Sequence, residues 1–133
     1  MTAYPLTSLI TLLTVLLMFV TSVFVGKARV KCDIKAPATS GHEIFDRAYR
    51  VQMNTLEAAA LMLPSLWIYA IFNGEVGAFV MGVIWLAGRA WYAKAYLTDP
   101  ARRGMGFGIA FVALAGLWFG ALMGLAMRGV SLV

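Results

Sequence analysis

Residues 45–64, FDRAYRVQMNTLEAAALMLP, join a polar stripe directly to an apolar run. Arg47, Arg50, Asn54 and Glu57 fall within an arc of about 80° when they are placed on an α-helix. The run that follows, residues 58–63, has the composition of a membrane-spanning segment. A charge inside a bilayer costs about 2.5–3.5 kcal/mol, so a cluster of charged side chains there indicates a function. The stripe predicts a site for a small, polar, anionic ligand.

The composition places the whole chain in lipid. Of the 133 residues, 62% are hydrophobic, and the mean hydropathy is +0.82. The first apolar segment begins at Pro5 and runs without a charge for about 31 Å of helix, enough to span the hydrocarbon core. It lacks the basic start and the small-residue cleavage site of a signal peptide. We expect an all-α integral membrane four-helix bundle, one domain over 1–133, with spans at about 5–26, 45–72, 77–97 and 105–127.

The basic residues indicate the orientation of the bundle. Ten of the eleven lysines and arginines lie in or beside the first and third loops, and Arg128 alone lies on the other side. By the positive-inside rule, these loops face the cytoplasm and both termini are non-cytoplasmic. The net charge of +5 follows from this topology. A basic groove for anionic lipid heads is an alternative use of the charge, and no nucleic-acid-binding motif accompanies it.

Small residues and single polar residues give weaker signals. Glycines recur at four-residue intervals in the fourth span, a pattern that allows close helix packing either within one subunit or between subunits. Cys32 and His42 are each solitary, so the sequence predicts no metal site, and His42 is expected to cap or solvate the first loop.

A second polar stripe lies near the cytoplasmic end of the third span. Trp85, Arg89, Tyr92 and Tyr96 are spaced by 4, 3 and 4 residues and share one narrow helix face. One interpretation is an interfacial aromatic belt with a snorkelling arginine. The interpretation that we favour is a wall of hydroxyl donors that faces the first stripe, within one subunit or across a subunit boundary.

The groups in the two stripes indicate what the ligand carries. Arginine forks suit carboxylates, and Glu57, expected to be a buried carboxylate, suits an ammonium. Gln52 and Asn54 add amides. Arg50 and Glu57 are separated by about 10 Å of helix rise, close to the length of an extended tripeptide. Glutathione has two carboxylates, one ammonium and a thiol between them, so it fits the description, as do other zwitterions.

Residues 45–57, FDRAYRVQMNTLE, followed by Pro64, resemble the signature of the MAPEG family, the membrane-associated proteins of eicosanoid and glutathione metabolism. The resemblance extends over nearly the whole chain and includes the first loop and residues 89–103. Its most specific part is Arg-x-Gln-x-Asn-x-x-Glu, which begins at Arg50. Ala58 stands where the family's leukotriene-forming synthase has a tyrosine, so one ligand contact is absent.

The resemblance implies a homotrimer that binds glutathione as co-substrate between neighbouring subunits and acts as a transferase or peroxidase in detoxification. Its partners are then copies of itself and lipophilic electrophiles or lipid hydroperoxides. Arg103 is the implied catalytic residue: it lies in the short link before a turn at Gly104, comes from the neighbouring subunit, and favours the thiolate, which is the nucleophile. The implied glutathione-binding residues are Arg29, Arg50, Gln52, Asn54, Glu57, Tyr92 and Tyr96.

Two other functions are compatible with parts of the sequence. A non-catalytic, lipid-binding member of the same family, similar to the lipoxygenase-activating protein, would need neither Tyr92 nor Arg103, and this chain has both. A small four-span exporter would explain Glu57 as a membrane carboxylate. It would leave Arg47, Arg50 and Asn54 without a purpose.

Overall fold

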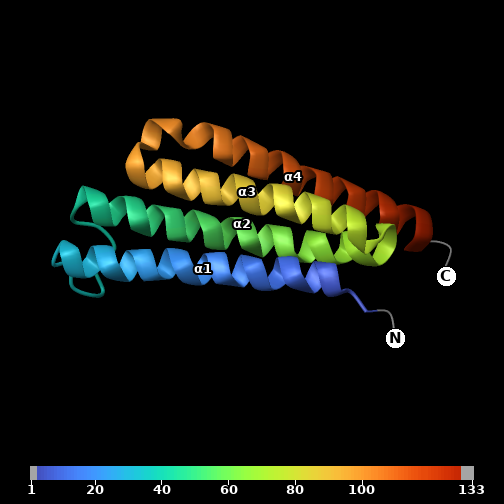
Figure 1. The fold of residues 1–133 in the computed structure, drawn as a ribbon, viewed down its shortest axis with the longest axis horizontal. Helices are drawn as coiled ribbons and strands as arrows, with labels where there is room; N and C mark the ends of the chain where they lie inside the picture. Colours follow the sequence, from blue (N-terminus) through green and yellow to red (C-terminus); the bar gives the residue numbers. More distant parts are fainter. Residues whose placement is uncertain (1–2, 130–133) are drawn as a thin grey trace.

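The computed structural model describes residues 3–129, which form four long helices packed side by side (Figure 1). The helices are α1 (Pro5–Lys31), α2 (Glu43–Asn73), α3 (Glu75–Thr98) and α4 (Arg103–Gly124). A 3-10 turn, η1 (Pro100–Arg102), precedes α4, and a π-helical turn, η2 (Leu125–Gly129), follows it. Four helical segments are long and apolar enough to cross a membrane, which confirms the predicted all-helical, four-span architecture. The predicted domain, 1–133, also includes residues 1–2 and 130–133, which lie outside the described residues.

The helices extend beyond the apolar spans at the charged end of the bundle. Helix α1 continues to Lys31, past the predicted end at residue 26, because its last turns carry basic side chains that water can solvate. Helix α2 begins two residues before the predicted span. As expected, His42 caps it: the His42 Nδ1 accepts a hydrogen bond from the Ile44 N–H at 3.2 Å.

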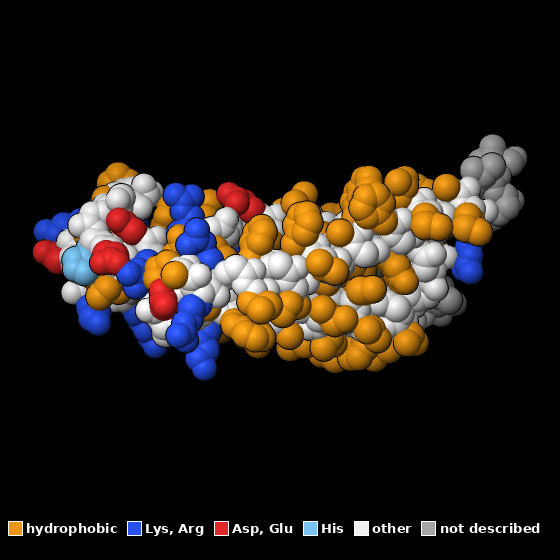
Figure 2. Space-filling model, turned by 90° about the horizontal axis from the view of Figure 1, so that it is seen from above, with side chains coloured by type: hydrophobic (Ala, Val, Ile, Leu, Met, Phe, Trp, Pro, Cys, Tyr) orange, Lys and Arg blue, Asp and Glu red, His pale blue; other side chains and the backbone are white. Residues whose placement is uncertain are grey.

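The two ends of the bundle differ in character. The α1–α2 loop and η1 lie at one end, and the start of α1 lies with the α2–α3 turn at the other (Figure 1). Charged side chains gather at the end that carries the α1–α2 loop, and hydrophobic side chains cover most of the remaining surface (Figure 2). The polar half of the molecule therefore lies where the sequence places the two polar stripes.

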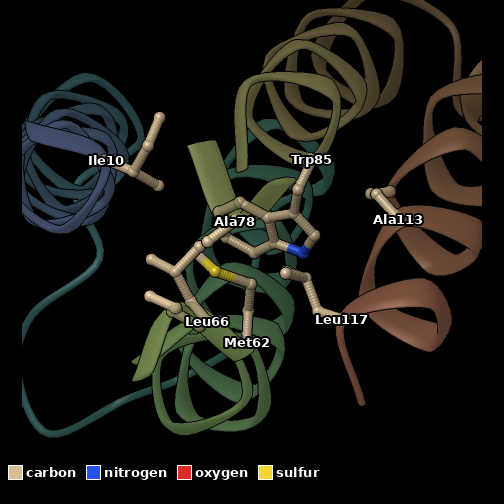
Figure 3. Packing of buried hydrophobic residues seen from close by; sticks show 10 residues of the cluster. Ile10, Met62, Leu66, Ala78, Trp85, Ala113 and Leu117 are labelled. Atoms are coloured by element: carbon tan, nitrogen blue, oxygen red, sulfur yellow. The ribbon is translucent and has the colours of Figure 1, made fainter. Parts of the chain in front are cut away.

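The core is built from one or two large residues of each helix. Ile10 of α1, Met62 and Leu66 of α2, Trp85 of α3 and Leu117 of α4 are all fully buried. They meet between the helices, with the Trp85 indole at the centre of the cluster (Figure 3). This layer fixes how α3 and α4 pack on α2, and one turn further along α3 begins the polar site.

Glycines bring α3 and α4 into backbone contact. A Cβ atom built at Gly106 would lie 2.4 Å from the Tyr92 nitrogen, and one at Gly88 would lie 2.7 Å from the Ala110 nitrogen. Any larger residue would push the helices apart, and lipid supplies no hydrophobic force to hold them together. The close approach brings the start of α4, with Arg103, beside the tyrosines of α3.

The glycine row of α4 packs within the subunit at two positions. A Cβ at Gly120 would lie 2.4 Å from the Tyr69 ring, and one at Gly124 would lie 2.4 Å from the Asn73 side chain. The Asn73 amide also donates a hydrogen bond to the Gly120 carbonyl at 2.8 Å. At these two positions the glycines therefore serve packing within one subunit, the first of the two interpretations, and not packing between subunits.

A carboxylate from α3 caps the start of α1. Tyr4, the N-cap residue, makes no side-chain cap hydrogen bond, and Pro5 has no N–H. The Glu75 Oε2 instead accepts hydrogen bonds from the Leu6 and Thr7 N–H groups at 3.0 and 3.3 Å. We predict that Glu75→Ala lowers the free energy of unfolding by about 1–3 kcal/mol, because two partly buried donors lose their acceptor. Thermal unfolding in detergent measures this loss.

The control for that substitution is Glu43→Ala. Glu43 pairs with Arg47 four residues along α2, on the exposed surface, where ion pairs contribute little. The melting temperature should fall clearly for Glu75→Ala and hardly change for Glu43→Ala. Equal melting temperatures for the two variants would mean that the cap does not stabilise the bundle.

Candidate functional site

The two polar stripes meet within one chain. The Asn54 amide of α2 donates a hydrogen bond to the Tyr92 hydroxyl of α3 at 3.0 Å. Trp85, Arg89 and Tyr92 are buried, with exposed fractions of 0%, 2% and 3%. Because a snorkelling arginine would reach the membrane surface, this burial excludes the aromatic-belt interpretation. The α3 stripe is a wall that faces α2.

A polar groove of about 370 Å³ opens beside this wall. Its lining comes from α2, α3 and the first turn and a half of α4: Arg50, Asn54, Tyr92, Tyr96, Arg103, Gly104 and Phe107. The Arg103 guanidinium lies 5.4 Å from the centre of the Tyr96 ring, and the rings of Tyr96 and Tyr92 are 5.6 Å apart. One chain therefore brings together five of the eight residues predicted for the site.

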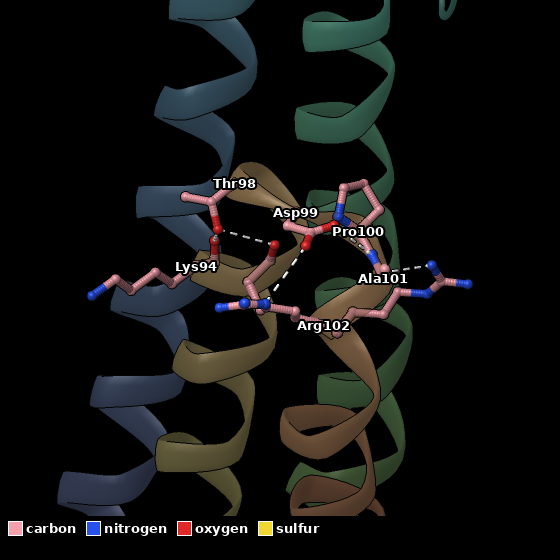
Figure 4. Close-up of polar contacts among 8 residues, drawn as sticks. Lys94, Thr98, Asp99, Pro100, Ala101 and Arg102 are labelled. Atoms are coloured by element: carbon pink, nitrogen blue, oxygen red, sulfur yellow. Dashed lines mark hydrogen bonds and ion pairs between the residues drawn. The ribbon is translucent and has the colours of Figure 1, made fainter.

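The link between α3 and α4 holds Arg103 in place. Asp99 ends α3 and accepts a hydrogen bond from the Ala101 N–H at 3.1 Å, which forms the η1 turn (Figure 4). The Arg103 Nη1 then donates to the Pro100 carbonyl at 2.8 Å. The prediction that Arg103 lies in the link before a turn at Gly104 is wrong: Arg103 is the first residue of α4, and Gly104 is helical. The η1 turn completes the reversal one residue earlier.

The polar groove continues into two further cavities along α2. Towards the charged end, a cavity of about 710 Å³ shares Arg50 and Tyr96 with the groove and extends to the α1–α2 loop. Towards the middle of the bundle, a cavity of about 260 Å³ shares Asn54 and Phe107 with it. We call this second cavity the apolar hollow; its lining is Asn54, Glu57, Ala58, Leu61, Trp85, Arg89, Phe107, Ala110, Phe111 and Leu114.

Glu57 is not the buried carboxylate that the sequence predicts. It lines the apolar hollow, but its side chain is exposed on this chain, as is that of Arg50. The reason is that this face of α2 points out of the four-helix bundle. Within residues 3–129, neither side chain forms an ion pair, whereas Arg47 pairs with Glu43. Arg50 and Glu57 are therefore not neutralised by each other or by another side chain of the described residues.

Two predicted site residues lie away from the groove of their own chain. The Arg29 guanidinium donates hydrogen bonds to the Ile34 and Ala38 carbonyls at 3.3 and 2.9 Å and stacks on the Phe45 ring at 4.6 Å. Its position organises the α1–α2 loop. Gln52 lies on the opposite side of α2 from Asn54, because two residues turn a helix by about 200°.

One buried contact near the site involves Thr55, which belongs to neither polar stripe. The Arg89 Nη2 donates a hydrogen bond to the Thr55 hydroxyl at 2.9 Å, and the Arg89 guanidinium lies 4.2 Å from the centre of the Tyr92 ring. Thr55 lies next to Asn54 but off the polar stripe, and its side chain is fully buried. A threonine in an apolar span is a weak signal, since its hydroxyl usually bonds to its own helix.

The groove offers charge and hydrogen bonds to an anion at the edge of lipid. Two guanidinium groups, two phenol hydroxyls and one amide line it, and aromatic rings border it. Such donors bind carboxylates and stabilise a thiolate. Within the described part of the chain, no group of three or more His, Cys, Asp or Glu residues could hold a metal ion.

Comparison with known proteins gives the family. The MAPEG family model matches residues 7–123. An uncharacterized protein of Synechocystis sp. is 41% identical over 116 residues, covering 87% of this chain and 85% of that protein. Microsomal glutathione S-transferase 2 of Homo sapiens is 31% identical over 102 residues, covering 77% and 69%. Leukotriene C4 synthase of Bos taurus is 36% identical over 94 residues, covering 71% of this chain and 63% of that protein.

The family match spans all four long helices, including both stripes and Arg103. The resemblance noted in the sequence is therefore confirmed, and the chain is an integral, multi-pass membrane protein that belongs to the MAPEG family.

Proposed function

We propose that this protein is a membrane-embedded glutathione transferase that activates the glutathione thiolate against lipophilic electrophiles, with lipid hydroperoxides as a second substrate class. The observation that carries the proposal is the polar groove: Arg50, Asn54, Tyr92, Tyr96 and Arg103 line one cavity that opens into the apolar hollow. Two relatives are named for related activities, glutathione S-transferase and leukotriene C4 synthase.

Glutathione binds along α2 in this proposal. Arg50 takes a carboxylate, Asn54 takes the peptide backbone, and Glu57 takes the ammonium, over about 10 Å of helix rise. The hydroxyls of Tyr92 and Tyr96 add hydrogen bonds from the facing wall. Arg103 lines the same groove as Arg50 in one chain, so the proposal uses the chain's own Arg103 in place of the neighbouring subunit's that the resemblance implies. The sulfur lies beside this Arg103, whose positive charge favours the thiolate over the thiol. The thiolate forms a carbon–sulfur bond with the electrophile as the leaving group departs.

The two cavities that adjoin the polar groove explain how a water-soluble and a lipid-soluble substrate can meet. Glutathione enters from the charged end, through the cavity that reaches the α1–α2 loop. The lipophilic partner enters the apolar hollow from the bilayer. Holding both at one boundary supplies much of the rate, because the reaction becomes effectively intramolecular.

The assembly in this proposal is a homotrimer with a site between neighbouring subunits. Arg50 and Glu57 are exposed on the single chain. Arg29 and Gln52 do not line the polar groove of their own chain. A neighbouring subunit that packs on this face would bury Arg50 and Glu57. It would also bring another copy's Arg29 and Gln52 within reach of the ligand.

We propose that the groove end faces the cytoplasm, where glutathione is present, and that both termini are non-cytoplasmic. The support is the concentration of basic side chains at that end. Reporter fusions measure this orientation: a reporter at either terminus should be non-cytoplasmic, and one inserted near Ser40 cytoplasmic. A cytoplasmic reporter at the C-terminus would contradict it.

Conjugation by the purified protein tests the proposed activity. In lipid nanodiscs, with glutathione and chlorodinitrobenzene, we expect conjugate to form at a rate that saturates with both substrates and is inhibited by S-methylglutathione. Glutathione binding without conjugation of any electrophile, and without reduction of a lipid hydroperoxide, would favour a non-catalytic lipid-binding protein. Absence of glutathione binding would overturn the proposal.

A further inference from the structure

Helices α1 and α3 leave an apolar groove between them on the outside of the bundle. Its volume is about 500 Å³, and only apolar residues line it: Leu13, Leu16, Leu17 and Val20 of α1, and Val83, Leu86, Ala87 and Ala90 of α3. Most of them are exposed at the protein surface. None lines the polar groove, the apolar hollow or the cavity at the charged end. We call this separate site the α1–α3 groove.

Lysines continue both walls of the α1–α3 groove towards the charged end. On α1 the lining residues cover an arc of about 100°, and Lys27 and Lys31 fall within that arc. On α3 the lining residues cover an arc of similar width, which includes Lys94. All three side chains are exposed, and none forms an ion pair within residues 3–129. Basic residues between helices at this edge of a membrane bind anionic lipid headgroups.

The lysines of the two helices lie close to the same depth. Helices α1 and α3 both run towards the charged end (Figure 1). A Cβ built at Gly82 would lie 2.6 Å from the Ile10 side chain, so these two residues are level. Counted from them, Lys27 lies about 7–8 Å nearer the charged end than Lys94. The long Lys94 side chain extends towards α1 (Figure 4), so both ammonium groups can reach one phosphate.

The length of the α1–α3 groove matches one leaflet of a bilayer. From Val83 to Lys94, α3 rises by about 16 Å, and each leaflet contributes about 15 Å of hydrocarbon. A membrane-spanning helix of another protein would lie along both leaflets. A site that is apolar in depth, basic at the edge and one leaflet long has the dimensions of a phospholipid.

We infer that the α1–α3 groove binds an anionic phospholipid, with its phosphate between Lys27 and Lys94 and one acyl chain between the two helices. A zwitterionic lipid carries an ammonium beside its phosphate, and this second charge repels the lysines. The bound lipid is a structural ligand and is not a substrate. The inference goes beyond the proposed function and does not depend on glutathione.

The proposed trimer leaves this site open to the bilayer. Arg29, which we place within reach of a neighbouring subunit's ligand, lies about 160° around α1 from Leu13. Of the four described spans, α1 has the smallest share of buried residues. A lipid that contacts α1 and α3 together would therefore stabilise the helix with the fewest contacts inside the bundle, as any ligand of the native state does.

Native mass spectrometry of the protein released from detergent tests the inference. With phosphatidylglycerol and phosphatidylcholine at equal concentration, we expect bound phosphatidylglycerol to exceed phosphatidylcholine by about fivefold or more per subunit. The double variant Lys27→Gln/Lys94→Gln should lose this preference. The control Lys35→Gln, which removes an exposed lysine of the α1–α2 loop, should keep it.

A second pair of variants tests the position of the acyl chain. Ala90→Phe fills the α1–α3 groove beside Lys94 and should lower lipid occupancy about fivefold or more. Ile84→Phe changes an exposed residue of α3 that does not line the groove, so occupancy should be unchanged. Glycerol 3-phosphate, which offers a phosphate without chains, should not displace the lipid.

Four results would overturn the inference. Equal binding of the two lipids by the parent protein would do so whatever the variants show. A preference that survives Lys27→Gln/Lys94→Gln would assign the headgroup to other basic residues, and unchanged occupancy in Ala90→Phe would place the chain elsewhere. A disulfide between two copies of Leu16→Cys, formed in membranes in a Cys32→Ser background, would show that another subunit covers the groove.

Discussion

Replacing Arg50 by alanine is expected to weaken glutathione binding by more than tenfold, or about 1.4 kcal/mol or more. Arg50 lines the polar groove and has no ion-pair partner among residues 3–129, so its charge is available to a ligand carboxylate. Glu57→Ala should have an effect of similar size, since it removes the partner of the ammonium. Equilibrium dialysis with radiolabelled glutathione, on protein in nanodiscs, measures both.

The control for this experiment is Arg47→Ala. Arg47 lies one turn before Arg50 on the same helix but is paired with Glu43. Its loss should leave glutathione affinity within about twofold of the parent protein, as expected for an exposed pair. Unchanged affinity in a correctly assembled Arg50→Ala protein would remove the central claim about the groove. Loss of assembly instead would assign Arg50 to the subunit interface.

Arg103→Ala is expected to slow conjugation by at least tenfold while glutathione still binds through Arg50 and Glu57. A tenfold loss corresponds to about 1.4 kcal/mol of transition-state stabilisation, a modest demand on one guanidinium near a developing charge. The Arg103 guanidinium is held by the Pro100 carbonyl and the Tyr96 ring, so its position relative to the groove is defined. Steady-state kinetics at saturating glutathione measures the loss as a fall in kcat.

Arg102→Ala is the matched control, because it removes the neighbouring charge. Arg102 lies in the η1 turn, where its side chain is 83% exposed and pairs with Asp99. It does not line the polar groove. Equal activity of the two variants would mean that Arg103 only anchors the link at the membrane surface, and the non-catalytic function would then be the better proposal.

The fold could be predicted because lipid imposes strong rules on sequence. Long apolar runs separated by Asn73-Gly74 and Asp99-Pro100 leave little choice but four helices. The exact ends of the helices were harder to predict. Residues outside the bilayer, such as Arg29 and Lys31 at the end of α1, can be helical or irregular. Hydropathy marks the limits of the membrane and not those of the helix.

The contact between the two polar stripes could also be predicted from the sequence. Helical spacing placed Asn54 on one face and Tyr92 on another at the same membrane depth, and their hydrogen bond follows from that register. The contact between Arg89 and Thr55 could not be predicted from the sequence. It depends on how closely the helices pack, and the glycines that bring α3 and α4 together, Gly88 and Gly106, lie outside the regular row of the fourth span.

Burial was the least predictable property of the site. Glu57 and Arg89 are both charged residues in apolar segments. The Glu57 side chain is exposed, whereas the Arg89 side chain is buried, with an exposed fraction of 2%. Helical periodicity gives the face of a side chain but not whether another helix covers that face. For the outward face of α2, the cover in our proposal is a neighbouring subunit.

Stopped-flow ultraviolet absorbance tests the central claim most directly. When the purified protein is mixed with glutathione at neutral pH, we predict a rise in thiolate absorbance that saturates with glutathione concentration. The rise should be absent in Arg103→Ala and retained in Arg102→Ala. Binding of glutathione without any thiolate signal in the parent protein would contradict the account, because the groove would then hold the tripeptide without activating its sulfur.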